Sequence, residues 1–540
     1  MAHGTATIAT LPSFAGLHFD NRFTRDLPGD PSSENRPRQV YEAGYSRVLP
    51  KPTTQPVLVH YSAEVAAELG LHVADIVSPE FLQLMSGNAV ADGMDPHAAC
   101  YGGHQFGNWA GQLGDGRAIT LGEVVNEPGE RFMLQLKGAG PTPYSRMADG
   151  LAVLRSSIRE FLCSEAMHHL GVPTTRALSL ATTGDQVLRD MFYDGRAAHE
   201  PGAVVCRVAP SFIRFGSFEI FAAREDHETL RMLADHTIAT HFPHLGDPGP
   251  ETYAAWFTEV ARRTAEMIVH WQRVGFVHGV MNTDNMSIHG LTIDYGPYGW
   301  LEDYDPSWTP NTTDAANRRY RFANQPAMAQ WNLTRLANAI FPLVGDADLL
   351  HEGLERYVDG FNVGWQQMMN DKLGLGPVTD GDEQLVGALL DLLPRTETDM
   401  TLFFRGLAQV PATSGPLATE ALLAPIAPAY YLPEQLTGDL LDDTVAWLER
   451  YRTRARATGL SDIDRADAMN QVNPLYVLRN YLAQLAIDAA QDQDDHGMVA
   501  ELLDVLRNPY REQPGMERYA EKRPDWARTR AGCSQLSCSS

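Results

Sequence analysis

The fold is decided by one stretch of the chain, His278-Gly279-Val280-Met281-Asn282-Thr283-Asp284-Asn285, together with the Asp294-Tyr295-Gly296 that follows it. The apolar spacing of Tyr253–Arg273 predicts a helix before this stretch, and Leu291–Ile293 predicts a short strand inside it. An Asn and an Asp at adjacent turns present hard oxygen ligands, which Mg²⁺ takes when it bridges nucleotide phosphates. The stretch therefore predicts a metal–nucleotide site at Asn285 and Asp294.

The same order of elements occurs in protein kinases, where a helix precedes an H-R-D-x-x-x-x-N loop, a short strand and a D-F-G triplet. Asn285 stands seven residues after His278, as the kinase Asn does after its His. The kinase general base should stand two residues after the His, but Val280 occupies that position and cannot accept a proton. The carboxylate of this loop is instead at Asp284. The residues therefore indicate a site that binds ATP and a metal ion but does not carry out ordinary phosphorylation.

A lysine and a glutamate upstream form a second candidate pair. Phe132–Lys137 alternates apolar and polar residues, which predicts a strand that ends in the lysine. Val153–Leu170 has a helical apolar stripe, and Glu160 lies off that stripe on a small, polar face. In kinases a strand lysine holds phosphates and a glutamate on the next helix holds the lysine. We therefore expect Lys137 and Glu160 to pair at a cleft.

Glycines and arginines near this strand are candidates for phosphate binding. Gly114-Asp115-Gly116-Arg117 precedes the strand, and its glycines permit close approach of the backbone to phosphates while its arginine offers a bidentate donor. A plain turn explains the same residues, and the aspartate is hard to reconcile with direct phosphate contact. Asp149-Gly150 follows the strand. Arg207 and Arg214 either supply charge to the site or form surface ion pairs.

The order of predicted elements is mixed strand and helix first and helices later, which predicts an α+β protein with a protein-kinase-like two-lobed fold. We expect an irregular N-terminal arm (1–55), a kinase-like N-lobe with the nucleotide-binding elements (56–215), a kinase-like C-lobe with the metal-binding loop (216–400) and a helical C-terminal extension with a cysteine-containing tail (401–540). Helices are expected at Val57–Leu69, Gln384–Leu393, Gly438–Arg454, Leu475–Ala490 and Gly497–Leu506.

Composition excludes some partners. The chain has 540 residues and a net charge of −25, which repels nucleic acid and anionic membrane surfaces. No apolar run reaches the roughly 20 residues of a membrane span, the N-terminus lacks a secretory pattern, and five cysteines make no disulfide framework. We therefore expect a cytoplasmic protein without nucleic-acid or membrane partners. Nothing indicates a coiled coil, so a monomer is favoured.

Several stretches resemble the selenoprotein O family. They are Leu134–Arg146, Ala152–Gly171, Arg207–Pro210, Ile213–Gly216 and Gly275–Gly296, and the resemblance runs from about residue 15 to the C-terminal Cys-Ser-Ser. This family consists of pseudokinases that act as protein adenylyltransferases. The resemblance implies transfer of AMP from ATP to Ser, Thr or Tyr hydroxyls of client proteins, with ATP bound in a flipped orientation that exposes its α-phosphate. It also implies Mg²⁺ or Mn²⁺ as the metal, and UMP transfer from UTP when Mn²⁺ is present.

The resemblance also implies a role for each candidate residue. Asp284 would accept the proton, Glu160 would orient Lys137, and Asn285 and Asp294 would bind the metal, which places Asp294 in the nucleotide site as well. Contacts to the nucleotide phosphates would come from Gly114, Gly116, Arg117, Lys137, Asp149, Gly150, Arg207 and Arg214.

The C-terminal tail departs from eukaryotic relatives, which end in a Cys-x-x-selenocysteine pair. Here Cys538 is followed by two serines. In a relative, the tail cysteine can pair with a cysteine in the loop after D-Y-G, but residues 301–314 contain none and Pro310 stands in its place. A redox lock of that design is therefore not expected, and Cys533 and Cys538 could pair with each other or stay free.

The residues alone leave two other functions open. One is a phosphotransferase acting on a small molecule, against which Val280 argues. The other is a catalytically weak pseudokinase scaffold that binds ATP and a client. The joint presence of Lys137, Glu160, Asn285 and Asp294 argues against the scaffold, because an inactive site need not keep both metal ligands and the Lys–Glu pair.

Overall fold

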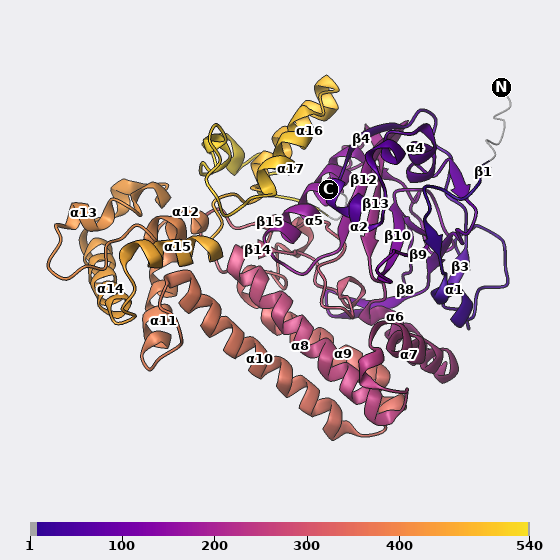
Figure 1. Ribbon diagram of the computed structural model, residues 1–540, viewed down its shortest axis with the longest axis horizontal. Coiled ribbons are helices and arrows are strands. Elements are labelled where there is room, and N and C mark those ends of the chain that lie inside the picture. The colour runs from indigo at the N-terminus through magenta and orange to yellow at the C-terminus, as the bar shows by residue number, and fades with distance from the viewer. Residues whose placement is uncertain (1–7, 538–540) are drawn as a thin grey trace.

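The computed structural model describes residues 8–537 and has strands mainly in its first part and helices in its second. Figure 1 shows the strands gathered at one side of the molecule, with long helices beneath them and a smaller helical region at the opposite side. The predicted α+β class is therefore confirmed. Among residues 8–537, no helix combines the length and the apolar character needed to cross a lipid bilayer.

A nine-stranded antiparallel sheet forms the body of the first part among the described residues. Its strands follow the order β3, β6, β9, β10, β13, β12, β4, with β2 paired to β9 and β11 paired to β13. The bounds are β2 His18–Phe19, β3 Tyr45–Arg47, β4 Val57–Tyr61, β6 His97–Ala99, β9 Ala118–Val125, β10 Arg131–Lys137, β11 Ala152–Val153, β12 Arg176–Arg189 and β13 Ala198–Ala209. The strand predicted at Phe132–Lys137 is confirmed as β10.

Helix α5, Leu154–His169, lies against β12 and β13 and confirms the helix predicted at Val153–Leu170. Nearly all of its residues are buried, because α16 (Asn480–Gln493) and α17 (Gly497–Leu506) cover its other side. In Figure 1 these two C-terminal helices lie near α5, away from the smaller helical region at the opposite side, which precedes them in the chain.

Three long helices lie side by side below the sheet in Figure 1: α8 (Pro250–Val274), α9 (Gln325–Val344) and α10 (Ala347–Leu373). The helix predicted at Tyr253–Arg273 is thus confirmed as α8. Gly275 ends it in the left-handed region, with φ 74°, and its N–H bonds to the carbonyl of Trp271.

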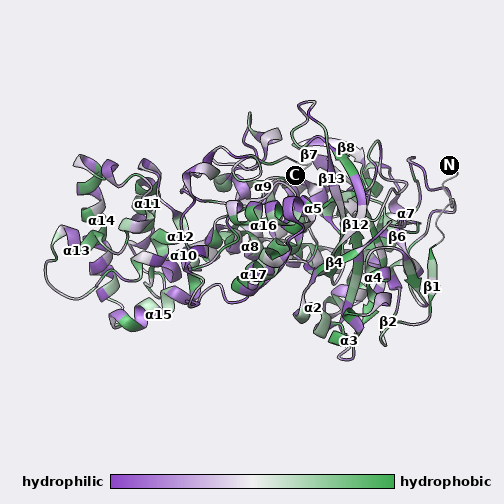
Figure 2. Ribbon diagram, turned by 90° about the horizontal axis from the view of Figure 1, so that it is seen from above, coloured by the Kyte–Doolittle hydropathy of each residue, from purple (hydrophilic) through white to green (hydrophobic). Residues whose placement is uncertain are grey.

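A second hydrophobic cluster holds the helical region at the far side together. Its helices are α11 (Asp382–Leu392), α12 (Met400–Leu407), α13 (Thr419–Leu423), α14 (Gly438–Arg456) and α15 (Asp462–Val472). Figure 2 shows these helices with both green and purple residues, as expected when one face packs inward and the other meets solvent.

One expectation about the first part is wrong, and another needs a small change. Val57–Leu69 is not one helix: β4 pairs with β12, and α2 (Ala63–Glu68) begins only after Ser62, whose hydroxyl accepts a hydrogen bond from Val65 N–H. The β-branched residues Val57 and Val59 favour the strand. Residues 8–55 are also less irregular than expected, since β2 and β3 join the large sheet.

Two further boundaries differ from expectation. Leu291–Ile293 does not form a strand, because only Thr292 makes bridges, one to Thr174 and one to Met286. The helix expected at Leu475–Ala490 begins at Asn480, after residues without regular secondary structure.

Candidate active site

An open cleft of about 750 Å³ collects most of the predicted site residues. Its lining comes from β9, β10, β12 and β13, from the glycine-rich turns around them and from the loop that follows α8. Glu160 and Arg214 lie behind the lining, in contact with residues that form it. The predicted residues that line it are Gly114, Gly116, Arg117, Lys137, Asp149, Gly150, Arg207, Asp284, Asn285 and Asp294.

The lysine at the end of β10 meets the glutamate of α5. Lys137 Nζ lies 2.7 Å from Glu160 Oε2, and Arg207 Nη1 lies 3.2 Å from Glu160 Oε1. Burial lowers the pKa of Lys137, and the charge of Glu160 opposes that effect. One carboxylate therefore holds two buried cations at the inner wall of the cleft.

Asp294 extends this network to the loop. Its φ of 57° is in the left-handed region, and its two carboxylate oxygens each lie 2.5 Å from an arginine, Arg207 and Arg214. Burial by itself would raise the pKa of Asp294, but the charges of Arg214, Arg207 and Lys137 hold it well below its usual value. Asp294 is therefore an anion, and Arg207 and Arg214 are buried members of the site and not surface ion pairs.

Asp284 has a different environment although it lies in the same cleft. Burial raises the pKa of its carboxyl to about 7, and the hydrogen bond from Gln105 Nε2 to Asp284 Oδ2, 3.1 Å, only partly opposes this. Its Oδ1 is buried and has no hydrogen-bond partner among the described residues. A carboxyl group with such a pKa and a vacant lone pair can accept a proton near neutral pH.

The loop between these carboxylates is fixed by its histidine. His278 Nε2 donates to the carbonyl of Ile293 (2.9 Å), while its Nδ1 accepts from Val280 N–H (3.3 Å). Both ring nitrogens are therefore engaged in holding the loop. Val280 lines the cleft and offers only a methyl surface there.

The donor set fits a divalent cation held between protein and phosphates. Asn285 Nδ2 donates to the carbonyl of Val280 (2.8 Å), which leaves the side-chain oxygen of Asn285 free to coordinate. Each oxygen of Asp294 has a second lone pair beyond the one directed at its arginine. Among residues 8–537 no cluster of three or more His, Cys, Asp or Glu could hold a metal alone, so the remaining ligands would have to be phosphate oxygens and water.

The glycine-rich turn before β9 carries a buried aspartate. Asp115 lies at the cleft but is only 2% exposed, and its Oδ2 accepts hydrogen bonds from Ala99 N–H (3.0 Å) and Gln135 Nε2 (3.2 Å), so these protein groups occupy that oxygen. Gly114 has φ 72°, and a Cβ there would lie 2.4 Å from the ring of Tyr144. Arg117 lines the cleft without a carboxylate partner among the described residues.

Asp149 and Gly150 lie at the rim. Both oxygens of Asp149 pair with Arg189 of β12, at 2.7 and 2.8 Å. Gly150 has φ 71°, and a Cβ there would lie 2.3 Å from the carbonyl oxygen of Gly140, so the turn accepts only glycine.

Sequence reasoning missed three polar residues of this site, Gln105, Gln135 and Arg189. Gln135 accepts a hydrogen bond from Arg207, and it shares a strand face with Lys137, so the alternation of β10 could have indicated it. Gln105 lies on a hairpin of β7 (Gly102–Gln105) and β8 (Asn108–Gln112), and Arg189 lies at the end of β12, and neither position carries a local signal.

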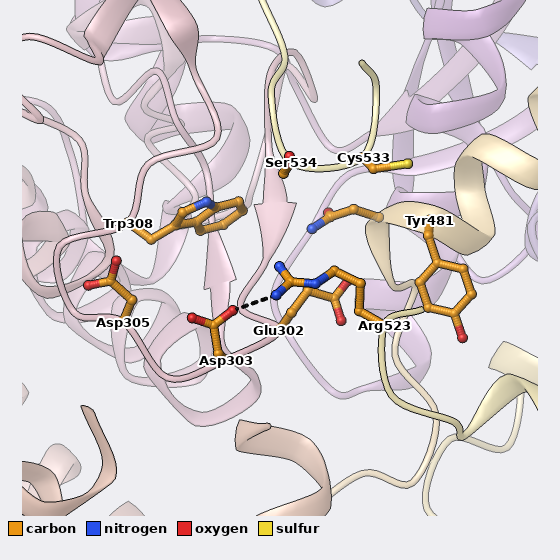
Figure 3. Close-up of a pocket in the computed structure, with 9 residues that line it drawn as sticks. Glu302, Asp303, Asp305, Trp308, Tyr481, Arg523, Cys533 and Ser534 are labelled. Atoms are coloured by element: carbon orange, nitrogen blue, oxygen red, sulfur yellow. Dashed lines mark hydrogen bonds and ion pairs between the residues drawn. The ribbon is translucent and has the colours of Figure 1, made fainter. Parts of the chain in front are cut away.

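The C-terminal tail packs beside the loop after Asp294. Leu536 N–H donates to the carbonyl of Pro310 (2.9 Å), and Thr312 N–H donates to the carbonyl of Leu536 (2.8 Å). Figure 3 shows Ser534 and Cys533 of the tail along the upper side of a small pocket, with Trp308 and Tyr481 below them and the ion pair of Asp303 and Arg523 between. Cys533 is a buried thiol, whereas Cys538 lies outside the described residues.

Comparison with known proteins places this chain in a family. Residues 32–507 match the family model described as protein adenylyltransferase SelO. The chain belongs to this family. It is 61% identical over 537 residues to the protein nucleotidyltransferase YdiU of Rhodopirellula baltica, covering 97% of this chain and 99% of the relative. It is 59% identical to that of an Azoarcus species and 55% identical to that of Flavobacterium johnsoniae, with 97% of this chain and 99% of each relative covered.

The resemblance to the selenoprotein O family is thereby confirmed, and with it the prediction that the chain is an enzyme of the nucleotidyltransferase class. Nucleotidyl transfer requires a nucleoside triphosphate, and the charges of the cleft suit one. Lys137, Arg207 and Arg117 present positive charge at a cleft in a chain whose net charge is −25.

Proposed function

We propose that this enzyme transfers AMP from ATP to Ser, Thr or Tyr hydroxyls of client proteins, with ATP bound in the flipped orientation. The observation that carries the proposal is that Val280 occupies the position of the kinase base while Asp284 supplies a carboxyl group elsewhere in the cleft. The position of the kinase base has no proton acceptor, while a buried carboxyl with a pKa of about 7 lies elsewhere in the cleft. An acceptor hydroxyl would then have to approach from the side of Asp284, which a reoriented nucleotide permits.

In this proposal the buried network binds the polyphosphate. Lys137, Arg207 and Arg117 contact phosphate oxygens, and Glu160 fixes the first two by the distances given above. Asn285 and Asp294 hold Mg²⁺ or Mn²⁺, which supplies neutralisation of the phosphate charge when it is bound. Gly114, Gly116 and Gly150 let the backbone approach the nucleotide, and Arg214 keeps Asp294 ionised. Asp149 orients Arg189 at the rim toward the nucleotide.

Asp284 then acts on the acceptor. Its Oδ1 lacks a hydrogen-bond partner among the described residues, so it can take the proton as the oxygen of the hydroxyl attacks the α-phosphate. The bond between the α- and β-phosphates breaks and pyrophosphate leaves. Burial keeps the carboxyl basic enough for this step, because a solvated aspartate would be a weaker base.

The proposal extends to the finer architecture and setting. The sheet with α5 corresponds to a kinase-like N-lobe, the helices from α6 (Phe215–Ala223) through α10 to a C-lobe, and the later helices to an extension, with boundaries at residues 55, 215 and 400. Transfer of UMP from UTP with Mn²⁺ uses the same phosphate contacts. A cytoplasmic monomer fits the buried thiols Cys100, Cys163 and Cys206, which form no disulfide.

Labelled nucleotides test this proposal. The purified protein is incubated with Mg²⁺ and ATP labelled on either the α- or the γ-phosphate, and label retained on protein is measured after denaturing electrophoresis. AMP transfer gives label from the α-position only. Label from the γ-position only would show a phosphotransferase and refute the proposal, and mass spectrometry of the labelled peptide identifies the acceptor hydroxyl.

A further inference from the structure

A basic surface follows the Asp294 loop in the chain. From Ala315 to Gly345 there is no lysine, aspartate or glutamate, but there are four arginines, Arg318, Arg319, Arg321 and Arg335. The whole chain has 68 acidic residues in 540, about one in eight, so these 31 positions would on average carry about four. The general composition of an acidic protein therefore does not account for this segment.

These four arginines also lack carboxylate partners. None of their guanidinium groups forms an ion pair within residues 8–537, whereas most buried arginines of the site do. The guanidinium groups of Arg319 and Arg335 lie over the ring of Trp331, at 4.7 and 4.9 Å from its centroid. The Nε atoms of both are buried without a hydrogen-bond partner among the described residues.

The other two arginines, Arg318 and Arg321, make few hydrogen bonds to the protein, so most of their N–H groups can bind a ligand. Arg318 is exposed and donates only to the hydroxyl of Ser307 (2.9 Å), and Arg321 donates to the carbonyl of Arg318 (3.0 Å). The nearby carboxylate of Asp314 is buried and accepts hydrogen bonds from the backbone N–H groups of Arg319 and Tyr320. The charge of Arg319 acts on Asp314 at longer range, but no carboxylate among residues 8–537 forms an ion pair with any of the four arginines, so most of their charge is not offset by the protein itself.

The surface borders the cleft on the side of Asp284. Tyr320, between two of the arginines, donates from its hydroxyl to Asn282 Oδ1 (2.6 Å) and accepts from Phe106 N–H (2.9 Å). Asn282 and Phe106 both line the cleft together with Asp284. A chain segment bound at these arginines would therefore continue into the cleft near the carboxyl that receives the proton.

We propose that Arg318, Arg319, Arg321 and Arg335 form a docking surface for an acidic segment of the client protein, adjacent to the hydroxyl that is modified. This inference rests on the proposed function. A guanidinium group binds a carboxylate through two parallel hydrogen bonds, and an Asp- or Glu-rich segment is repelled by the rest of this acidic protein. The surface therefore selects the sequence around the acceptor by attraction at one place and repulsion elsewhere.

Peptide binding without nucleotide tests the docking surface. The probes are two fluorescent synthetic peptides that carry a central tyrosine flanked either by glutamates or by lysines, and binding to the full-length protein is followed by fluorescence anisotropy. We expect the glutamate peptide to bind and the lysine peptide not to bind. Charge reversal at the exposed Arg318 and the half-buried Arg321, Arg318→Glu with Arg321→Glu, is expected to weaken binding about tenfold or more.

Control variants make the result specific. Arg356→Glu changes an exposed arginine of α10 outside this surface and should bind the glutamate peptide as the wild type does. Arg318→Gln with Arg321→Gln removes the charge without reversing it, should give a smaller loss, and replaces the reversal variant if that variant does not fold. High salt should weaken binding of the glutamate peptide, because the contacts are exposed charges.

Three results would overturn the inference: equal binding of the two peptides, unchanged binding in both double variants, or an equal loss in Arg356→Glu. Preferential binding of a single-stranded oligonucleotide, lost in the same double variants, would assign the surface to nucleic acid and overturn it as well. Binding here requires no nucleotide, so a failure of AMP transfer, seen as absent α-label, is distinguishable from a failure of docking.

Discussion

Asp294→Asn removes the carboxylate that lies between Arg207 and Arg214. In the native protein each of its oxygens is 2.5 Å from one guanidinium group, and those two side chains are almost completely buried. The variant keeps the shape of the side chain but leaves two buried cations, with Lys137 nearby, short of one negative charge. Breaking a buried ion pair costs about 3–5 kcal/mol. Since the Asp294 side chain is 20% exposed, we expect a loss near the lower limit, about 3 kcal/mol.

Urea denaturation at neutral pH, without nucleotide or metal, measures this loss in the free energy of unfolding. Asp303→Asn is the matched control, because Asp303 also pairs with an arginine, Arg523 at 3.0 Å, but is 31% exposed and lies away from the cleft. That variant should lose about 1 kcal/mol or less. Equal losses in the two variants would refute the reasoning that the buried network depends on Asp294. Asp294→Asn should also lose α-label transfer. Normal labelling in this variant would contradict the proposed role of Asp294 in binding metal and nucleotide.

Three further changes have defined outcomes. Lys137→Ala should abolish α-label transfer while Glu160 keeps Arg207 in place, and labelling at the wild-type rate in a folded variant would contradict a phosphate role. Wild-type labelling should rise with pH through about 7 as Asp284 ionises, and Asp284→Ala should give a slower rate with a flatter pH profile; identical profiles would rule Asp284 out as proton acceptor. Burial raises the pKa of Glu123 from 4.5 to about 7, so wild-type stability falls as pH rises through that interval, by (7 − 4.5) × 1.36, or about 3 kcal/mol. Glu123→Gln should lack this fall in denaturation at about pH 5 and about pH 8, and parallel pH dependences would show that Glu123 is ionised throughout.

Much of the site was predictable because its signals are local. The spacing of His278 and Asn285, the alternation of β10 and the apolar stripe of α5 each depend on a few neighbouring residues. The pairing of Lys137 with Glu160 could also be predicted, because the sequence places the lysine at the end of a strand and the glutamate on the helix that follows. The roles of the individual residues stay predictions until the variants above are measured.

Other elements could not be predicted because distant segments decide them. Val57–Tyr61 forms a strand because β12 offers it an edge and its β-branched residues suit a strand, although the residues after it form a helix. Leu291–Ile293 has strand-like residues but only the bridges of Thr292 for pairing, and it therefore stays irregular. The helix expected from Leu475 starts late, at Asn480. The first two differences depend on the pairing partner that the fold offers each segment, which its own residues do not specify.

The sequence by itself predicted a metal–nucleotide loop and placed a valine at the position of the kinase base, because residue type and spacing along one loop are local properties. Only the tertiary structure decided the electrostatics of that loop. Asp284 and Asp294 are the same residue type ten positions apart, yet burial raises the pKa of the first while two arginines hold that of the second far down. Those arginines come from β13 and from the residue before α6, so no reading of the loop alone could separate the two carboxylates.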